Sequence, residues 1–431
     1  MVKLRPRVLV VAEAANPEWV SVPLVGWSLV AALRKVADVH LVTQIRNRDA
    51  ILRAGLIEGK DFTAIDSEII ARPLYRLSEA LTRGKGGWTT KQAISLVSYL
   101  WFERLLWKEF GHRIQGGEFD MVHRVTPLSP TASSPIAGKC RKAGVPFVMG
   151  PLNGGVPWPK GFDKERRLER EWLSYVRGVY KILPGRNSTL AAASAIIVGS
   201  RYTEQEVPAR YREKCIYIPE NAIDPSRFSR KASPGSGGRS LRACFVGRIV
   251  PYKGADMVIE ATAGLLRTGQ ITIDIVGDGP ALKDLKMLAE REAVGAGVRF
   301  HGWLEHAQVQ DVLSQCDLFV FPSIREFGGG AVLEAMAVGL PPLIVDYAGP
   351  AELVSSATGY KVSLGKRHEI VRELRDVLNE LAKDSSSLGV KGAAARLCVA
   401  EHFTWEKKAS QISQIYAWVQ GERTDRPVFF P

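Results

Sequence analysis

Residues 319–339 read FVFPSIREFGGGAVLEAMAVG, and this stretch decides the fold. It begins with an apolar run that predicts a buried strand ending at Pro322, and it closes with a pattern that predicts a helix. Three glycines, Gly328, Gly329 and Gly330, separate the two. A strand that passes through a glycine-rich loop into a helix is typical of parallel α/β sheets, which bind ligands at the carboxyl ends of their strands.

The loop itself carries groups suited to a phosphate and a diol. Glycines allow backbone N–H groups to approach a ligand, and the partial positive charge of a helix N-terminus favours an anion there. Glu326 precedes the glycines and Glu334 follows them, and this spacing lets both carboxylates point into one cleft. A carboxylate accepts hydrogen bonds from two hydroxyls of a sugar or ribose. The alternative for Glu334 is a capping or ion-pairing role.

A second loop of the same kind lies at residues 244–254, which read CFVGRIVPYKG. A strand again ends in a loop that leads into a helix, expected over residues 255–266. Arg248 offers a planar fork of donors and Lys253 a point charge, and together they can neutralise a pyrophosphate. Two cations on one loop are usually only solvated. Two such loops at strand ends of one domain predict an anion-binding site.

Short β-branched runs alternate with helical patterns along the chain, which predicts βαβ units and parallel sheets. The glycine- and serine-rich stretch 233–240 interrupts the alternation and is typical of a linker or an exposed loop. Expected strands lie at residues 8–11, 39–43, 121–123, 147–149, 195–198 and 216–218 before it, and at 243–246, 271–276, 298–301, 318–321 and 343–345 after it. We therefore expect an α/β protein of two doubly wound, Rossmann-like parallel-sheet domains facing each other across a cleft.

Composition restricts the class of protein. An apolar fraction of 46% and a charged fraction of 24% over 431 residues are ordinary for a soluble globular protein. No apolar run approaches the roughly 18 residues of a membrane span, and the start of the chain lacks a signal-peptide core, so we expect a cytoplasmic protein. Five scattered cysteines without a Cys-x-x-Cys pair indicate reduced thiols rather than a disulfide framework or a zinc site.

The net charge of +13 indicates an anionic partner, which could be nucleic acid, a membrane surface or a charged substrate. Between Lys160 and Arg186, eight Lys or Arg residues face four acids, with aromatic residues among them. Both a solvated helix face and peripheral contact with the inner face of an anionic membrane fit this pattern. A nucleic-acid-binding protein is the less favoured alternative, because the sequence carries no helix-turn-helix, zinc-finger or RNA-binding signature.

The order of the motifs resembles retaining glycosyltransferase family 4, whose members have the GT-B fold. The matching segments are Gly247-Arg248, Lys253-Gly254, residues 276–280, Glu326-x7-Glu334, and blocks at 218–224, 301–303 and 348–352. The resemblance covers nearly all of residues 216–355. It implies an acceptor-binding domain over residues 1–222, a donor-binding domain over 223–403, and a C-terminal segment, 404–431, whose helix crosses back to the first domain.

The resemblance also implies a role for each matching residue. Arg248 and Lys253 would hold the donor diphosphate, Glu334 would bind the nucleotide ribose, and Glu326 would contact the transferred sugar. The implied donor contacts are Gly247, Arg248, Lys253, Trp303, Leu304, Glu326, Gly328, Gly329, Gly330, Ala331, Val332 and Glu334. The family is usually metal-independent, so we expect no metal and no bound cofactor, only a nucleoside-diphosphate sugar, linked to UDP or GDP, as donor.

Two departures from the family pattern concern the first half of the chain. Many members have a Gly-Gly pair at the first helix, where this chain has Ser21, which could supply its hydroxyl or amide instead. Many members also carry a His after the fourth strand. Here that stretch contains Asn153, Gly154 and Gly155, which are candidates to line the acceptor side of the cleft. His123, at the end of its own strand, is either a further catalytic candidate beside Glu326 or a core residue.

The resemblance implies transfer of a sugar, with retention of anomeric configuration, to a hydroxyl of a carbohydrate or lipid-linked acceptor, as in polysaccharide or glycolipid synthesis. One alternative is another GT-B enzyme, such as a nucleotide-sugar 2-epimerase. Another is a homologue that only binds sugar nucleotides, although the paired glutamates Glu326 and Glu334 argue against it.

Overall fold

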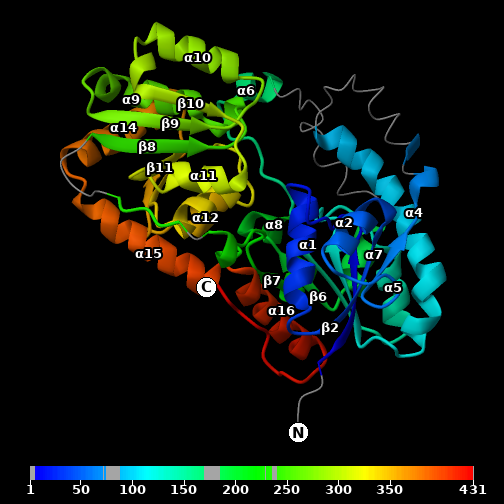
Figure 1. Ribbon diagram of the computed structural model, residues 1–431. Helices are drawn as coiled ribbons and strands as arrows, with labels where there is room; N and C mark the ends of the chain where they lie inside the picture. Colours follow the sequence, from blue (N-terminus) through cyan, green and yellow to red (C-terminus); the bar gives the residue numbers. More distant parts are fainter. Residues whose placement is uncertain are drawn as a thin grey trace. The chain divides into compact units, whose positions relative to one another are not determined.

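The computed structural model describes residues 5–70, 72–73, 88–168, 185–228, 230–234 and 240–430. The chain forms two compact units (Figure 1). The first comprises Met1–Gly155, Glu169–Glu220 and Trp405–Pro431, and the second comprises Val156–Leu168 and Asn221–Thr404. Most of the expected linker 233–240 and of the basic stretch between Lys160 and Arg186 lies outside the described residues.

The first unit contains a seven-stranded sheet in the order β3-β2-β1-β4-β5-β6-β7, with parallel pairing throughout the described strands. β1 reads RVLVVA and is buried over all but its first residue, as expected for a strand covered on both faces. Its elements are β1 (Arg7–Ala12), α1 (Val22–Leu33), β2 (Asp38–Gln44), α2 (Arg48–Arg53), β3 (Phe62–Ile65), α4 (Trp88–Gln115), β4 (Met121–Thr126), α5 (Pro135–Lys142), β5 (Phe147–Leu152), α7 (Arg186–Ala192), β6 (Ala195–Val198), α8 (Arg201–Glu206), β7 (Cys215–Tyr217) and α16 (Trp405–Val419).

The second unit contains a six-stranded parallel sheet in the order β10-β9-β8-β11-β12-β13. Figure 1 shows α9, α10 and α14 on one face of this sheet and α11, α12 and α15 on the other. Its elements are α6 (Asp163–Leu168), β8 (Leu241–Val246), α9 (Ala255–Arg267), β9 (Ile271–Val276), α10 (Leu282–Arg291), β10 (Val298–Gly302), α11 (His306–Leu313), β11 (Leu318–Phe321), α12 (Gly330–Ala337), β12 (Pro342–Val345), α13 (Ala348–Leu353), β13 (Tyr360–Val362), α14 (Arg367–Lys383) and α15 (Ser386–His402).

The predicted fold class of two doubly wound parallel-sheet domains is confirmed, and each expected strand is present within one or a few residues of its expected bounds. The structure adds two strands that the sequence did not reveal, β3 and β13. It also corrects one assignment: residues 156–168, expected in the first domain, pack with the second unit.

The C-terminal helix α16 packs in the first unit. Its residues Ala409, Ile412, Ile415 and Tyr416 are buried in the same apolar cluster as Leu29 of α1. The apolar stripe of this helix therefore faces the core of the first unit. The last strand of that unit, β7, ends at Tyr217, almost 200 residues before α16 begins.

Candidate functional site

The two glycine-containing loops leave the second sheet at its topological switch point. β8 and β11 are parallel neighbours at the centre of this sheet. From them the strand order runs through β9 and β10 on one side and through β12 and β13 on the other. Open parallel sheets bind ligands at such a point, beyond the carboxyl ends of the strands. Residues 247–254 follow β8 and residues 322–329 follow β11, so the structure brings both predicted loops together there.

Lys253 and Glu326 join the two loops through an ion pair. Their side chains are 16% and 19% exposed, so the pair is sheltered yet reachable from solvent. The Lys253 ammonium also lies over the ring of Phe321, 5.0 Å from its centroid, and a cation is attracted to the face of an aromatic ring. Arg248 differs from Lys253, because its exposed side chain makes no hydrogen bond or ion pair with any residue that the structure describes. Its charge is available to an anion.

The glycine loop has a shape that only glycine permits. Gly329 precedes α12 in the left-handed conformation, with φ at 59°, which side chains rarely adopt. A β-carbon on Gly328 would lie 2.3 Å from the side-chain nitrogen of Asn221. The amide of Val332 already donates to the Gly329 carbonyl at 3.0 Å. Among the predicted phosphate contacts, the amides of Gly330 and Ala331 at the first turn of α12 therefore suit an anion better than that of Val332.

Glu334 lies in α12 in a setting unlike that of Glu326. Burial raises its pKa to about 7, and the nearby Arg227 guanidinium opposes that rise. Nδ1 of His306 lies 3.8 Å from Oε1 of Glu334. Burial lowers the pKa of His306, so the imidazole is neutral near pH 7 and the contact is no charged pair. Among the described residues no Lys or Arg forms an ion pair with Glu334, which disfavours the ion-pairing role considered from the sequence.

Three neighbours of the site were not predicted as site residues: Asn221, Arg227 and His306. His306 is the first residue of α11 and follows β10 closely, so its place after a strand end was a signal that the sequence offered. Asn221 was part of the matching block 218–224, but its contact with the glycine loop was not foreseen. Arg227 ends a short 3-10 helix, and nothing in its local sequence indicates that it lies near Glu334.

Trp303 and Leu304 follow β10, the edge strand of the second sheet. The Trp303 side chain is 67% exposed, which is unusual for so large an apolar group. A solvent-facing indole presents a flat surface on which a nucleotide base can stack. Contact with the base stays a prediction for both residues.

Residues 156–158 dock onto both loops of the second unit. The Arg325 guanidinium lies over the Trp158 ring at 5.1 Å and over the Tyr252 ring at 6.0 Å, and the two rings meet edge to face. Arg325 Nε donates to the Val156 carbonyl at 3.3 Å. The Tyr347 hydroxyl donates to the Pro157 carbonyl at 3.0 Å. Arg325 and Tyr252 directly precede Glu326 and Lys253 in the chain, so this segment contacts the neighbours of both members of the ion pair.

The candidates Ser21, Asn153, Gly154 and Gly155 belong to the first unit. Ser21 is exposed and precedes α1 with φ at 66°, a strained conformation for a residue with a side chain. Asn153 is engaged within the unit, because its amide nitrogen donates to the Glu220 carboxylate at 2.6 Å and its oxygen accepts from the Gly155 amide at 2.8 Å. The predicted roles of these residues on the acceptor side stay predictions.

His123 also belongs to the first unit, and its geometry favours the core interpretation. The side chain is fully buried. Nδ1 lies 2.6 Å from the Tyr416 hydroxyl and Nε2 lies 2.9 Å from the Gly150 carbonyl, so both ring nitrogens have partners. Burial lowers its pKa to about 4, which keeps the ring neutral. We therefore do not include His123 among the residues proposed to contact a sugar.

Across the part of the chain that the structure describes, no group of three or more His, Cys, Asp or Glu side chains is arranged to hold a metal ion. In the same residues, no helix is both long and apolar enough to cross a membrane.

Part of the second unit is similar to a known protein family. Residues 227–391 match the family model described as "Glycosyl transferases group 1". The matched region contains Arg248, Lys253, Glu326 and Glu334. The match covers less than half of the chain and shows that this region is similar to the glycosyltransferase group 1 family.

Curated relatives align with parts of the chain. Glycogen synthase from Mycobacterium tuberculosis (strain CDC 1551 / Oshkosh) is 30% identical over 216 residues, which are 49% of this chain and 51% of that protein. The GDP-mannose-dependent monoacylated alpha-(1-6)-phosphatidylinositol monomannoside mannosyltransferase from Corynebacterium glutamicum is 32% identical over 259 residues, which are 55% of this chain and 66% of that protein. The chain thus spans about half the length of the first curated relatives that it matches.

Among solved structures, that of Anabaena Alr3699/HepE in complex with UDP is similar with a TM-score of 0.61 and 16% sequence identity. The likeness covers 95% of this chain and 99% of that chain. At this identity it shows the fold alone, and it supports the GT-B assignment for the two parallel-sheet units.

Proposed function

We propose that this protein is a group 1 glycosyltransferase of the retaining, family 4 type, which moves a sugar from a nucleoside-diphosphate sugar to an acceptor hydroxyl. The observation that carries the proposal is the Lys253–Glu326 pair beside the N-terminus of α12. One cation, one carboxylate and free helix amides lie at the switch point of the sheet, where an anionic ligand with hydroxyl groups is the best match.

The chemistry follows from the charges that develop during transfer. As the bond between the sugar and the diphosphate breaks, negative charge grows on the leaving diphosphate and positive charge grows on the sugar. Lys253, Arg248 and the first amides of α12 would stabilise the diphosphate. Glu326 would hold the Lys253 ammonium in position and accept hydrogen bonds from sugar hydroxyls. These groups are set in place before the reaction, so little reorganisation is needed during it.

For the donor, we propose a UDP- or GDP-linked hexose. The Anabaena structure contains UDP, and the name of the Corynebacterium relative specifies GDP-mannose. Glu334 would bind the ribose, which the two nucleotides share, and Trp303 would contact the base. For the acceptor, we propose a carbohydrate or a lipid-linked hydroxyl compound, with the name of the Corynebacterium relative supporting the lipid-linked class.

Peripheral contact with an anionic membrane is part of the same proposal, resting on the basic composition of residues 160–186. Sedimentation with liposomes tests it, since equal binding to neutral and anionic vesicles would remove it.

The decisive experiment compares Lys253→Met and Glu326→Gln with the unchanged protein. A thermal-shift screen over nucleoside diphosphates and their sugars first identifies the donor, because a tight ligand raises the melting temperature by mass action. Donor turnover is then measured as release of the nucleoside diphosphate. We expect each substitution to lower turnover on the order of a hundredfold or more, as is typical for the loss of one preorganised charge.

Lys286→Met is the matched control. Lys286 also lies over an aromatic ring, that of Phe300 at 5.7 Å, but it belongs to α10 and to neither of the two loops. We expect this variant to turn over the donor normally. Normal turnover in Lys253→Met would overturn the site assignment. If the product is instead an epimerised nucleotide sugar, the proposed sugar transfer is wrong and the protein is a nucleotide-sugar epimerase.

A further inference from the structure

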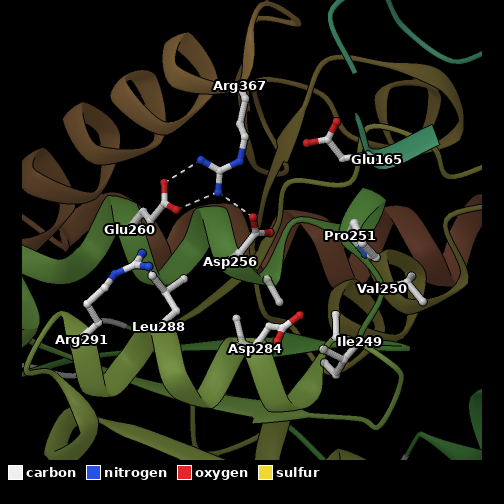
Figure 2. A pocket seen from close by; sticks show the side chains of 13 residues that line it. Glu165, Ile249, Val250, Pro251, Asp256, Glu260, Asp284, Leu288, Arg291 and Arg367 are labelled. Atoms are coloured by element: carbon white, nitrogen blue, oxygen red, sulfur yellow. Dashed lines mark hydrogen bonds and ion pairs between the residues drawn. The ribbon is translucent and has the colours of Figure 1, made fainter. Parts of the chain in front are cut away.

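The second unit contains a pocket whose lining includes none of the residues proposed to contact the donor. Its volume is about 500 Å3, within the range of roughly 300–1,000 Å3 common for small-molecule sites. Figure 2 shows side chains from several elements converging on it, with Arg367 from the start of α14, Asp284 and Leu288 from α10, and Glu165 from α6. All lining residues belong to one unit.

One wall of this pocket is the back of the loop that follows β8. Ile249, Val250 and Pro251 line the pocket, and they lie in the chain between Arg248 and Lys253, the two cations of the candidate site. The Ile249 carbonyl accepts a hydrogen bond from the amide of Ala281 at 3.2 Å, which ties this wall to the start of α10. The pocket and the candidate site therefore share a loop but no lining side chain.

Apolar side chains form part of the pocket wall. Ile249, Val250, Leu285 and Leu288 line it and are almost fully buried. Apolar walls of this kind bind the carbon chain of a ligand, because such a chain leaves water on binding. They also lower the local dielectric constant, so charges at the mouth act more strongly than on an open surface.

The charged residues around the pocket are mostly acidic. Arg367 forms ion pairs with two of them, since its guanidinium bonds to Glu260 at 2.7 Å and to Asp256 at 2.6 Å. Glu165 and Asp284 are the other two, and neither forms an ion pair or a hydrogen bond through its side chain with the residues that the structure describes. Arg291 is the remaining basic residue; its side chain is 72% exposed and pairs with its neighbour Glu292 at 3.9 Å.

The lining thus carries four carboxylates against two guanidinium groups, a net charge of −2. This is the opposite of the whole chain, whose net charge is +13. General surface charge therefore does not account for the composition of the pocket. A ligand complementary to it has at least two positive charges, for Glu165 and Asp284, and an aliphatic body for the apolar walls.

We propose that this pocket binds a small organic cation of the aliphatic di- or polyamine class. The amine groups bond to Glu165 and Asp284 at the mouth, and the methylene chain lies against Leu285, Leu288 and the wall formed by residues 249–251. A hydrated inorganic cation does not fit as well, because it gains nothing from the apolar walls and loses part of its hydration shell.

Isothermal titration calorimetry with spermidine tests the proposal on the full chain and needs no enzymatic activity, so its result is independent of the proposed function. We expect saturable binding of one spermidine per chain. The double variant Glu165→Gln, Asp284→Asn should bind spermidine at least about tenfold more weakly. It removes both charge contacts while keeping the size of the side chains.

Glu290→Gln is the control, because Glu290 is an exposed carboxylate on the same helix as Asp284 but does not line the pocket. It should bind spermidine as the unchanged protein does. Mg2+ at the same concentration should not compete. The proposal is overturned by the absence of saturable binding, by equal affinity in the double variant, or by displacement of spermidine by Mg2+, which would indicate nonspecific attraction to negative charge.

Discussion

Glu334 and Glu326 are both carboxylates of the same loop and helix, yet their surroundings differ. Glu326 has the Lys253 ammonium beside it, whereas burial raises the pKa of Glu334 to about 7. Both forms of Glu334 are therefore populated near neutral pH. Only the ionised carboxylate accepts hydrogen bonds from both hydroxyls of a ribose, so protonation of this one residue should control nucleotide binding.

We expect the affinity for the donor to rise about tenfold between pH 6 and pH 8, because the ionised fraction of a group with a pKa near 7 rises by that factor. UDP-glucose and GDP-mannose are suitable ligands, since their diphosphates do not titrate in this range. Calorimetry at each pH measures the effect. Glu334→Gln should bind the donor weakly at every pH. If the affinity of the unchanged protein varies with pH only as much as that of this variant, Glu334 does not bind the ribose in its ionised form.

The same pKa gives an opposite expectation for stability. A carboxyl group whose pKa is raised by folding contributes stability that is present below about pH 4.5 and lost as pH rises through about 7. Relative to the unchanged protein, Glu334→Gln should therefore gain melting temperature at pH 8 and not at pH 4.5. Stability gained together with binding lost is the expected signature of a group kept for function.

At the scale of an element, the segment 156–158 acts on the two loops without belonging to either. Trp158 stacks with Arg325 and meets the Tyr252 ring, and both of these precede a member of the Lys253–Glu326 pair. An aromatic group that holds the neighbours of two charged residues restricts where those residues point. Trp158 is therefore expected to be a positioning residue of the site.

We expect Trp158→Ala to weaken donor binding or turnover roughly two- to thirtyfold, the range that corresponds to losing a cation–π contact of about 0.5–2 kcal/mol. Trp158→Phe keeps a ring under the guanidinium and should stay closer to the unchanged protein. Steady-state kinetics and calorimetry separate the effects on binding and on turnover. Equal values for Trp158→Ala and the unchanged protein would show that this segment does not support the site.

The elements also show what the sequence could predict. The strands β8, β9 and β11 were predicted because each is a mostly apolar run that ends at a glycine or proline signal. The missed strand β3 reads FTAI and β13 reads YKV; each is short and is interrupted by a polar residue, Thr63 or Lys361, whereas the equally short β6 and β11 are apolar throughout. The docking of residues 156–158 on the second unit could not be predicted either, because the chain order places them between two strands of the first.

The site was predictable to the extent that its chemistry is local. Lys253 and Glu326 were identified from two loops 73 positions apart, and the structure pairs them. The contact of His306 with Glu334 depends instead on how the start of α11 packs against α12, which no local pattern encodes. The buried partners of His123 likewise come from β5 and α16, so its packing was not apparent from the strand that contains it.

At the scale of the whole molecule, the chain passes between the units after Gly155, Leu168, Glu220 and Thr404, and hydrogen bonds join the residues around the last two passages. In the second unit the Ile223 amide donates to the Phe403 carbonyl at 2.7 Å. In the first unit the Lys408 ammonium donates to the carbonyls of Pro219 and Glu220. Lys408 thus links the start of α16, which follows the passage at Thr404, to residues 219–220, which precede the passage at Glu220.

Lys408 is 3% exposed; burial lowers its pKa to about 7, and the Glu220 carboxylate opposes this shift. In the unfolded chain the amine keeps its ordinary pKa of about 10.4, so the unfolded state binds more protons between these values. Its contribution to stability is therefore complete above about pH 10 and is lost as pH falls towards 7, with a slope approaching about 1.4 kcal/mol per pH unit.

We expect the urea concentration at the unfolding midpoint of the first unit to rise from pH 7 to pH 9. In Lys408→Met this rise should be smaller, because the variant lacks the share that comes from the buried amine. Lys35→Met is the control, because Lys35 is 61% exposed and pairs with Glu406 of α16, the helix that contains Lys408. An unchanged rise in Lys408→Met would mean that the buried amine does not titrate as its setting implies.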